Sequence, residues 1–210
     1  MSQLINEIKS RGENCLEAEV FEDKIQFKNT NISFPLTEEW EVLHDNEVIS
    51  NLNNYIFPSD FSKESNTTPE KLISTIPKPI ITIRDTSYDF PMSISFCAFQ
   101  GQSLKNGHNL KPRSIVKYEI MWSSWIFEKI NKNGFGRNTV KQFKINEYFA
   151  ACGGTVINFN NSKFKNIELA LSILAVEIDD LVIILYGLSY FTDYEKMIGS
   201  MKKIKMVRPN

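Results

Sequence analysis

Residues 168–190 read ELALSILAVEIDDLVIILYGLSY and carry the strongest secondary-structure signal in the chain. Two apolar runs rich in Ile, Leu and Val flank Asp179-Asp180, a pair that is typical of tight turns. The pattern predicts a β-hairpin whose strands are apolar enough to lie in the middle of an antiparallel sheet. Thr192-Asp193-Tyr194-Glu195 follows as a capping-box pattern and predicts a helix that lies across the sheet.

Alternating apolar residues predict further strands on both sides of one long helix. The predicted strands lie within 19–27, 32–34, 80–84, 92–99, 140–145 and 155–159, with a turn at Gly153-Gly154. Apolar residues recur at steps of three and four between Ile115 and Ile130, which predicts the long helix. This order predicts an α+β fold in which an antiparallel β-sheet is covered by two main helices.

The length and the composition of the chain predict one folded unit. Its 210 residues, of which 42% are hydrophobic, suit a single α+β domain over 1–210. Residues 44–79 are dense in Asn, Ser and Pro, so we expect a long irregular excursion there. Loops of this length are often functional, which makes the excursion a candidate binding region.

The layout resembles the superfamily that includes the PsbP subunit of the photosynthetic oxygen-evolving complex, DcrB-type bacterial proteins and the Eag chaperones of type VI secretion. The resemblance rests on Ile32-Ser33-Phe34-Pro35 followed by Trp40, on the long helix near Ser114–Ile130, and on the closing hairpin that runs into a helix ending at Ser200-Met201. It implies a PsbP-like α/β/α sandwich around an antiparallel sheet. It also implies a role in binding another protein, with no catalysis.

Charge and targeting signals limit the classes of partner. Lys and Arg total 24 and Asp and Glu total 25, so no overall field favours nucleic acid or an anionic membrane. The basic cluster Lys202, Lys203, Lys205 and Arg208 is explained by a solvated tail that follows a helix. No secretory signal is visible and no apolar run is long enough to span a membrane, which predicts a cytoplasmic protein.

Catalytic and metal signatures are not found in the sequence. Cys152, in Ala-Cys-Gly-Gly, is the best nucleophile candidate, and a small cysteine-dependent hydrolase or transferase that uses Cys152 with His108 or His44 is the alternative function. The two histidines are isolated, and the three cysteines have no zinc-knuckle spacing. We therefore assign no catalytic residue, no metal site and no cofactor.

The functional prediction is a non-enzymatic protein-interaction module that binds a client, an effector or a toxin. It could act as a secretion-system chaperone or adaptor, or as a toxin-neutralising (immunity) partner, and the sequence does not choose between them. An acidic stretch is the candidate contact patch, with a solvated face as the alternative. Its acidic residues are Glu38, Glu39, Glu41, Asp45 and Glu47, and Trp40 within the stretch is the sixth candidate binding residue.

Overall fold

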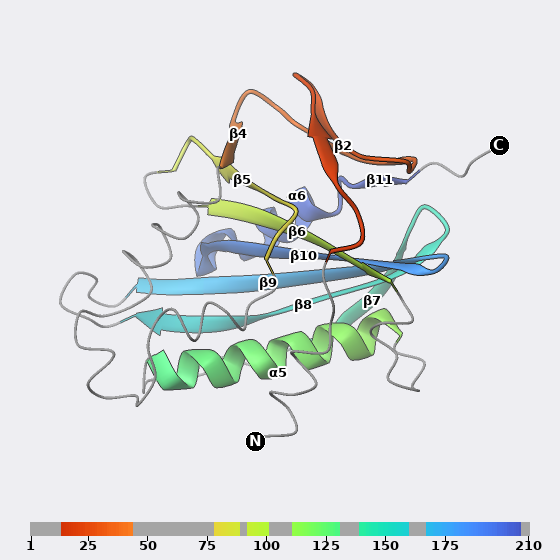
Figure 1. Ribbon diagram of the computed structural model, residues 1–210. Helices are drawn as coiled ribbons and strands as arrows, with labels where there is room; N and C mark the ends of the chain where they lie inside the picture. Colours follow the sequence, from red (N-terminus) through yellow and green to blue (C-terminus); the bar gives the residue numbers. More distant parts are fainter. Residues whose placement is uncertain are drawn as a thin grey trace.

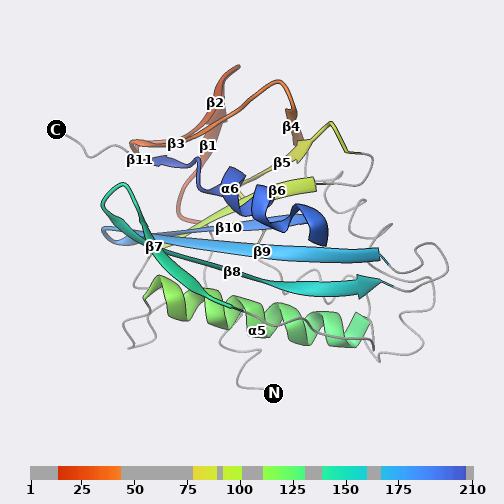
Figure 2. The same cartoon turned by 180° about the vertical axis from the view of Figure 1, so that it is seen from behind.

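The protein is built around a seven-stranded antiparallel sheet, seen here in a computed structural model that describes residues 14–43, 78–88, 92–100, 111–130, 139–159 and 167–206. The strand order is β4-β5-β6-β10-β9-β8-β7 (Figures 1 and 2). The strands are β4 (Trp40–Leu43), β5 (Ile81–Asp85), β6 (Met92–Gln100), β7 (Lys141–Ile145), β8 (Tyr148–Phe159), β9 (Ile167–Ile178) and β10 (Leu181–Tyr190).

The predicted hairpin is confirmed as β9 and β10, near the middle of this sheet. Ile178 pairs with Leu181 across a two-residue turn, and Asp179 adopts a left-handed φ of 51° there. Asp tolerates this conformation better than most residues because its short polar side chain bonds locally. Strand β10 also pairs with β6, and β9 also pairs with β8. Both strands of the hairpin are therefore flanked by neighbouring strands.

A second sheet of four strands has the order β1-β2-β3-β11. Its strands are β1 (Ala18–Val20), β2 (Lys24–Phe27), β3 (Ile32–Pro35) and β11 (Lys205–Met206). The first and last parts of the described chain therefore meet in one sheet, because β11 pairs with β3. Within the described residues the helices are α5 (Pro112–Ile130), the 3-10 turn η1 (Phe191–Asp193) and α6 (Tyr194–Met201).

The predicted fold class is wrong, because the described chain is mostly β and two helices do not cover the sheet. Helix α5 packs on β8 and β9 from one side of the large sheet, and α6 packs on β10 and β9 (Figure 1). Helix α6 has only eight residues, too few to cover its face. The small sheet covers much of the rest, because its alternating apolar residues must also be buried.

Two apolar cores result, one on each face of the large sheet. The first joins the small sheet, α6 and the large sheet, and Phe96 of β6 lies at its centre, with the ring of Phe34 at 5.0 Å and that of Phe27 at 6.0 Å. The second lies on the α5 side and contains Val116 and Ile120 of that helix. Alternation along each strand divides its side chains between these cores.

The predicted turn at Gly153-Gly154 is also wrong, since both glycines lie inside β8. A Cβ atom on Gly153 would lie 2.8 Å from Ile120 Cδ1 of α5. One on Gly154 would lie 2.6 Å from the Leu171 carbonyl oxygen and 2.8 Å from the ring of Tyr194 on α6. The pair therefore lets helices approach the same strand from both faces, a known use of strand glycines.

We expect Gly154→Ala to destabilise the protein by about 1–3 kcal/mol, because the added methyl group meets a backbone oxygen that cannot move aside cheaply. Denaturant unfolding would measure the change.

Gly199→Ala is the matched control, since that α6 position is exposed with nothing within 4 Å of the added carbon. It should stabilise the protein by about 0.5–1 kcal/mol through helix propensity. A Gly154→Ala protein as stable as the parent would contradict the close-packing account.

Candidate functional site

The acidic stretch lies at one edge of the large sheet, in β4 and the turn before it. Glu38 and Glu39 are exposed, whereas Trp40 is half-buried and packs against the core. Glu41 lies opposite Arg84 in the register of β4 and β5, and the two side chains form an ion pair. The indole therefore anchors a strand whose acidic neighbours face solvent.

Main-chain hydrogen bonds hold the backbone of this turn in place. The Glu39 carbonyl oxygen accepts hydrogen bonds from the Thr86 N–H at 2.7 Å and from its hydroxyl at 3.1 Å. The Trp40 N–H donates to the Thr37 carbonyl at 2.9 Å. The carboxylates of Glu38 and Glu39 are thus carried on an ordered backbone, which lowers the entropy that a partner would have to remove on binding.

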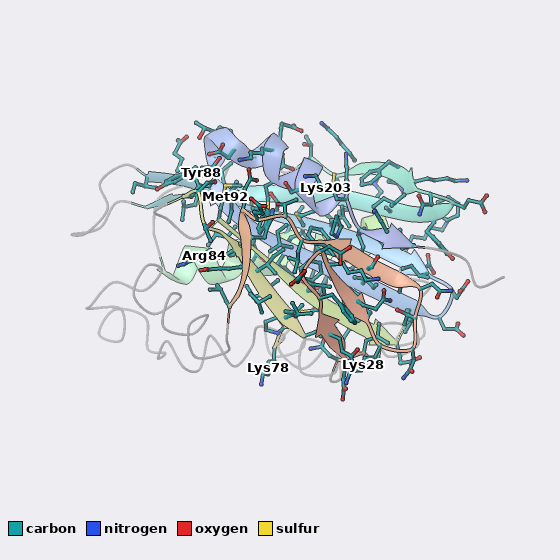
Figure 3. The ribbon with its side chains drawn as sticks, turned by 90° about the horizontal axis from the view of Figure 1, so that it is seen from above. Lys28, Lys78, Arg84, Tyr88, Met92 and Lys203 are labelled. Carbon is teal, nitrogen blue, oxygen red and sulfur yellow. The ribbon has the colours of Figure 1, made fainter. Side chains whose placement is uncertain are left out.

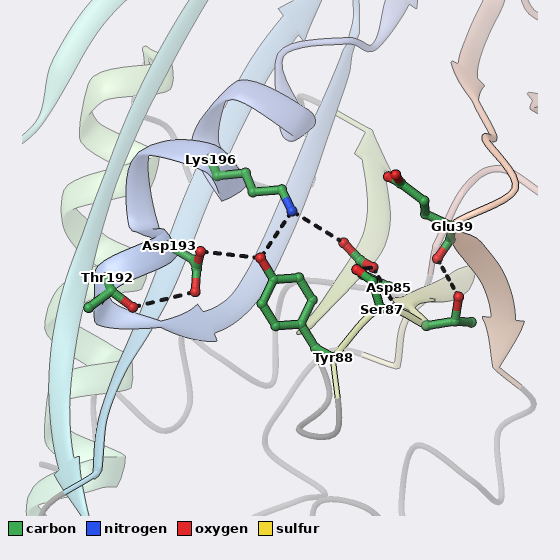
Figure 4. A network of polar contacts seen from close by, with 8 residues as sticks. Glu39, Asp85, Ser87, Tyr88, Thr192, Asp193 and Lys196 are labelled. Carbon is green, nitrogen blue, oxygen red and sulfur yellow. Dashed lines mark hydrogen bonds and ion pairs between the residues drawn. The ribbon is translucent and has the colours of Figure 1, made fainter.

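A polar cluster lies behind this edge and connects β5 with α6 (Figure 4). We call it the Asp85–Lys196 cluster, and its members are Asp85, Ser87, Tyr88, Asp193 and Lys196. Lys196 Nζ donates to the Tyr88 hydroxyl at 3.0 Å and lies 3.9 Å from Asp85 Oδ2. The Tyr88 hydroxyl donates to Asp193 Oδ1 at 3.2 Å.

Asp85 is the buried member of the cluster, with only 1% of its surface exposed. Its carboxylate accepts hydrogen bonds from both the N–H, at 3.0 Å, and the hydroxyl of Ser87. A buried carboxylate needs such partners, because desolvation is costly when its oxygens lack hydrogen bonds. These contacts hold the start of the β5–β6 connection in a single geometry.

The charge of Lys196 is stabilised by this arrangement. Its pKa is raised, chiefly by the hydrogen bond to Tyr88, which outweighs the lowering effect of burial, and to a lesser extent by the negative charges of Asp85 and Glu39. Lys196 also lies over the Tyr88 ring, 4.8 Å from its centroid.

The structure brings together four of the predicted binding residues, Glu38, Glu39, Trp40 and Glu41, while Asp45 and Glu47 lie outside the described residues. It adds Tyr88 and Lys196, which sequence reasoning missed because 108 residues separate them. Asp193 was expected in a capping box. Instead it shows no side-chain capping bond and bonds Tyr88, because α6 is preceded by a 3-10 turn.

The thiol of Cys152, the candidate nucleophile, is buried. Cys152 lies in β8 with 3% exposure, and burial raises its pKa despite the opposing charges of Lys202 and Lys141. Because the thiolate is the nucleophile, a raised pKa disfavours catalysis. His44 and His108, the proposed bases, lie outside the described residues.

The described residues carry neither a metal-binding cluster nor a membrane-spanning helix. Within those ranges, no three His, Cys, Asp or Glu side chains are grouped closely enough to hold a metal ion. Nor does any helix there combine the length and the apolar character needed to cross a membrane. The candidate site is the acidic edge together with the Asp85–Lys196 cluster.

Comparison with known proteins places the fold. No family model and no curated protein sequence matches the chain. The cyanobacterial PsbP protein CyanoP from Synechocystis sp. PCC 6803 superposes with a TM-score of 0.53 at 8% identity, over 93% of this chain and 95% of that one. The fold is PsbP-like.

Two other solved structures are similar at lower scores. LpqN of Mycobacterium tuberculosis, described as involved in cell envelope biogenesis, has a TM-score of 0.47 and 12% identity, over 93% of each chain. PA94 of Pseudomonas aeruginosa, a protein of unknown function, has a TM-score of 0.35 and 10% identity, over 95% of this chain and 100% of that one. Of the predicted resemblance, the PsbP-like fold is confirmed.

A double-mutant cycle with Tyr88→Phe and Lys196→Met should show that the two side chains are coupled. We expect a coupling energy of about 0.2–1 kcal/mol, kept small because Lys196 is half exposed and screened by solvent. Denaturant unfolding at pH 8 would measure it.

The pH dependence of the same contact has a defined sign. Since folding raises the pKa of Lys196 above its ordinary value of 10.5, its contribution is complete below that pH and is lost as the pH rises further. Lys117→Met removes a lysine from the exposed face of α5 and is the matched control for Lys196→Met. It should show no coupling energy with Tyr88→Phe. A coupling energy of zero at pH 8 would contradict the role of the cluster.

Thiol labelling tests the cysteine alternative. In the native protein we expect Cys15, which is half-buried, to react with a thiol reagent faster than Cys97 and Cys152, which are buried. Burial raises the pKa of Cys15 above 9.0, so its labelling rate should still increase as the pH passes 9. Cys15→Ser should remove the fast phase, whereas fast labelling of Cys152 at neutral pH would revive the nucleophile hypothesis.

Proposed function

We propose that this chain is a non-enzymatic protein-interaction module that binds another protein through the acidic edge of its large sheet. The observation that supports this most directly is the pairing of exposed carboxylates, on Glu38 and Glu39, with an ordered backbone anchored by Trp40. A preorganised charged surface favours both the rate and the specificity of association.

The chemistry of the edge favours a partner with a cationic surface. Glu38 and Glu39 are exposed, and Asp85 and Asp193 add negative charge behind them. Among the described residues, Arg84 and Lys196 are the cations of the acidic edge and the cluster, and both contact carboxylates there. A basic patch on a partner would therefore meet an excess of negative charge here.

Among the finer roles, a toxin-neutralising partner agrees best with this surface. Such a protein presents acidic groups to the cationic active site of an enzyme, and charge complementarity gives it fast association. A secretion-system chaperone or adaptor is the other role within the same proposal, with the edge strand β4 accepting a client segment. We place either role in the cytoplasm, as the sequence predicts.

The experiment is affinity capture of the endogenous protein from its native cell, followed by mass spectrometry and by binding measurements on the recovered partner. Glu38→Lys/Glu39→Lys should weaken partner binding by about tenfold or more, since reversal replaces attraction by repulsion. The loss should shrink at high salt.

Glu147→Lys/Asp180→Lys is the matched control, because these exposed residues of the β7–β8 and β9–β10 turns undergo the same charge change away from β4. The control should bind normally. If both double variants bind the partner equally well, the acidic edge is not the binding surface.

A further inference from the structure

Strand β7 forms the opposite edge of the large sheet and has the opposite charge. Among the described strands it pairs only with β8, and Lys141, Gln142 and Lys144 are exposed. Alternation places Lys141 on the α6 side, where it lies 3.9 Å from Glu195, and Lys144 on the α5 side. The edge thus presents a cation to each face of the sheet.

Each of these faces also carries a lysine over a phenylalanine ring. On the α6 side, Lys202 Nζ lies 4.4 Å from the ring centroid of Phe143 in β7. On the α5 side, Lys144 Nζ lies 5.3 Å from the ring of Phe149, its register partner in β8. Phe149 is 64% exposed, the highest value among the large apolar side chains of the described residues.

The fold extends this basic edge with residues from the end of the chain. The Asn146 side chain, in the β7–β8 turn, donates a hydrogen bond of 2.8 Å to the Met206 carbonyl of β11. This contact links β11 to the β7–β8 turn (Figure 2), and the exposed Lys203 and Lys205 lie just before β11 and within it. Seen from above, Lys203 lies to the right and Arg84 and Tyr88 lie to the left (Figure 3).

Protection of the edge explains only part of this arrangement. Lysines on an edge strand commonly prevent edge-to-edge aggregation. That role does not require a largely exposed phenylalanine beside the edge, because such a ring favours the aggregation that the lysines oppose. An apolar contact next to paired cations is instead suited to recognition.

We propose that β7 accepts an extended acidic segment of a partner protein by strand addition. An added strand directs successive side chains to opposite faces, so its carboxylates would meet Lys144 on one face and Lys141 with Lys202 on the other. Alternate backbone groups of β7 point away from β8 and would supply the hydrogen bonds. A membrane surface is disfavoured, since a flat lipid layer would contact only one of these faces.

The first test uses a synthetic peptide of alternating Glu and Thr residues as the probe. Binding to the full chain would be measured by calorimetry at low salt, with a peptide of alternating Lys and Thr as the charge control. Lys141→Glu/Lys144→Glu should weaken binding of the acidic peptide by about tenfold. Lys24→Glu/Lys117→Glu, which carries the same charge change on β2 and α5, should bind as the parent does.

The second test separates strand addition from attraction by charge alone. Hydrogen exchange of the β7 amides should slow when the acidic peptide is bound, and Phe149→Ala should weaken binding without changing the net charge. Binding that leaves β7 exchange unchanged would overturn strand addition.

Two further results would also overturn the proposal. One is equal binding of the acidic peptide by both double-lysine variants. The other is binding to phosphatidylglycerol vesicles that Lys141→Glu/Lys144→Glu abolishes, with no binding of the peptide.

Discussion

The burial of β9 and β10 on both faces is the constraint on which the rest of the structure depends. Their apolar residues do not alternate with polar ones, so neither face can be left in water. One face is covered by α5 over β8 and β9. The other needs both α6 and the small sheet, because the eight-residue α6 covers only part of it.

Small residues at the contact points make this covering possible. Gly153 and Gly154 allow approach from opposite faces of β8, and Gly187 of β10 lies under Met197 and Met201 of α6. Close packing of this kind increases dispersion contacts and leaves little tolerance for added volume. The interior of the sheet is consequently filled by close-packed apolar side chains.

The two edges differ in charge although the whole chain is nearly neutral. The β4 edge carries the acidic stretch and the Asp85–Lys196 cluster, whereas lysines of β7, of the segment after α6 and of β11 lie at the β7 edge. The net charge of the chain predicts no strong overall electrostatic field, but it carries no information about how charge is distributed between the two edges.

Much of the fold could be predicted from local patterns. The central hairpin, its Asp179-Asp180 turn and the long helix were correct because short-range periodicity and turn chemistry determine them. The fold class was wrong, since β11 has only two residues and the small sheet depends on its pairing with a strand near the other end of the chain. The turn predicted at Gly153-Gly154 was wrong for a similar reason. A glycine needed for a turn and a glycine needed for close packing cannot be distinguished from the local sequence.

The sequence by itself determined the periodic segments, the near-neutral charge and the acidic stretch from Glu38 to Glu41, because each depends on residues close together in the chain. Only the tertiary structure decided that Tyr88 meets Lys196 and that Lys202 lies over Phe143. These contacts depend on which strands become edges and where α6 packs. Both are set by the burial of distant apolar surfaces, which no local pattern specifies.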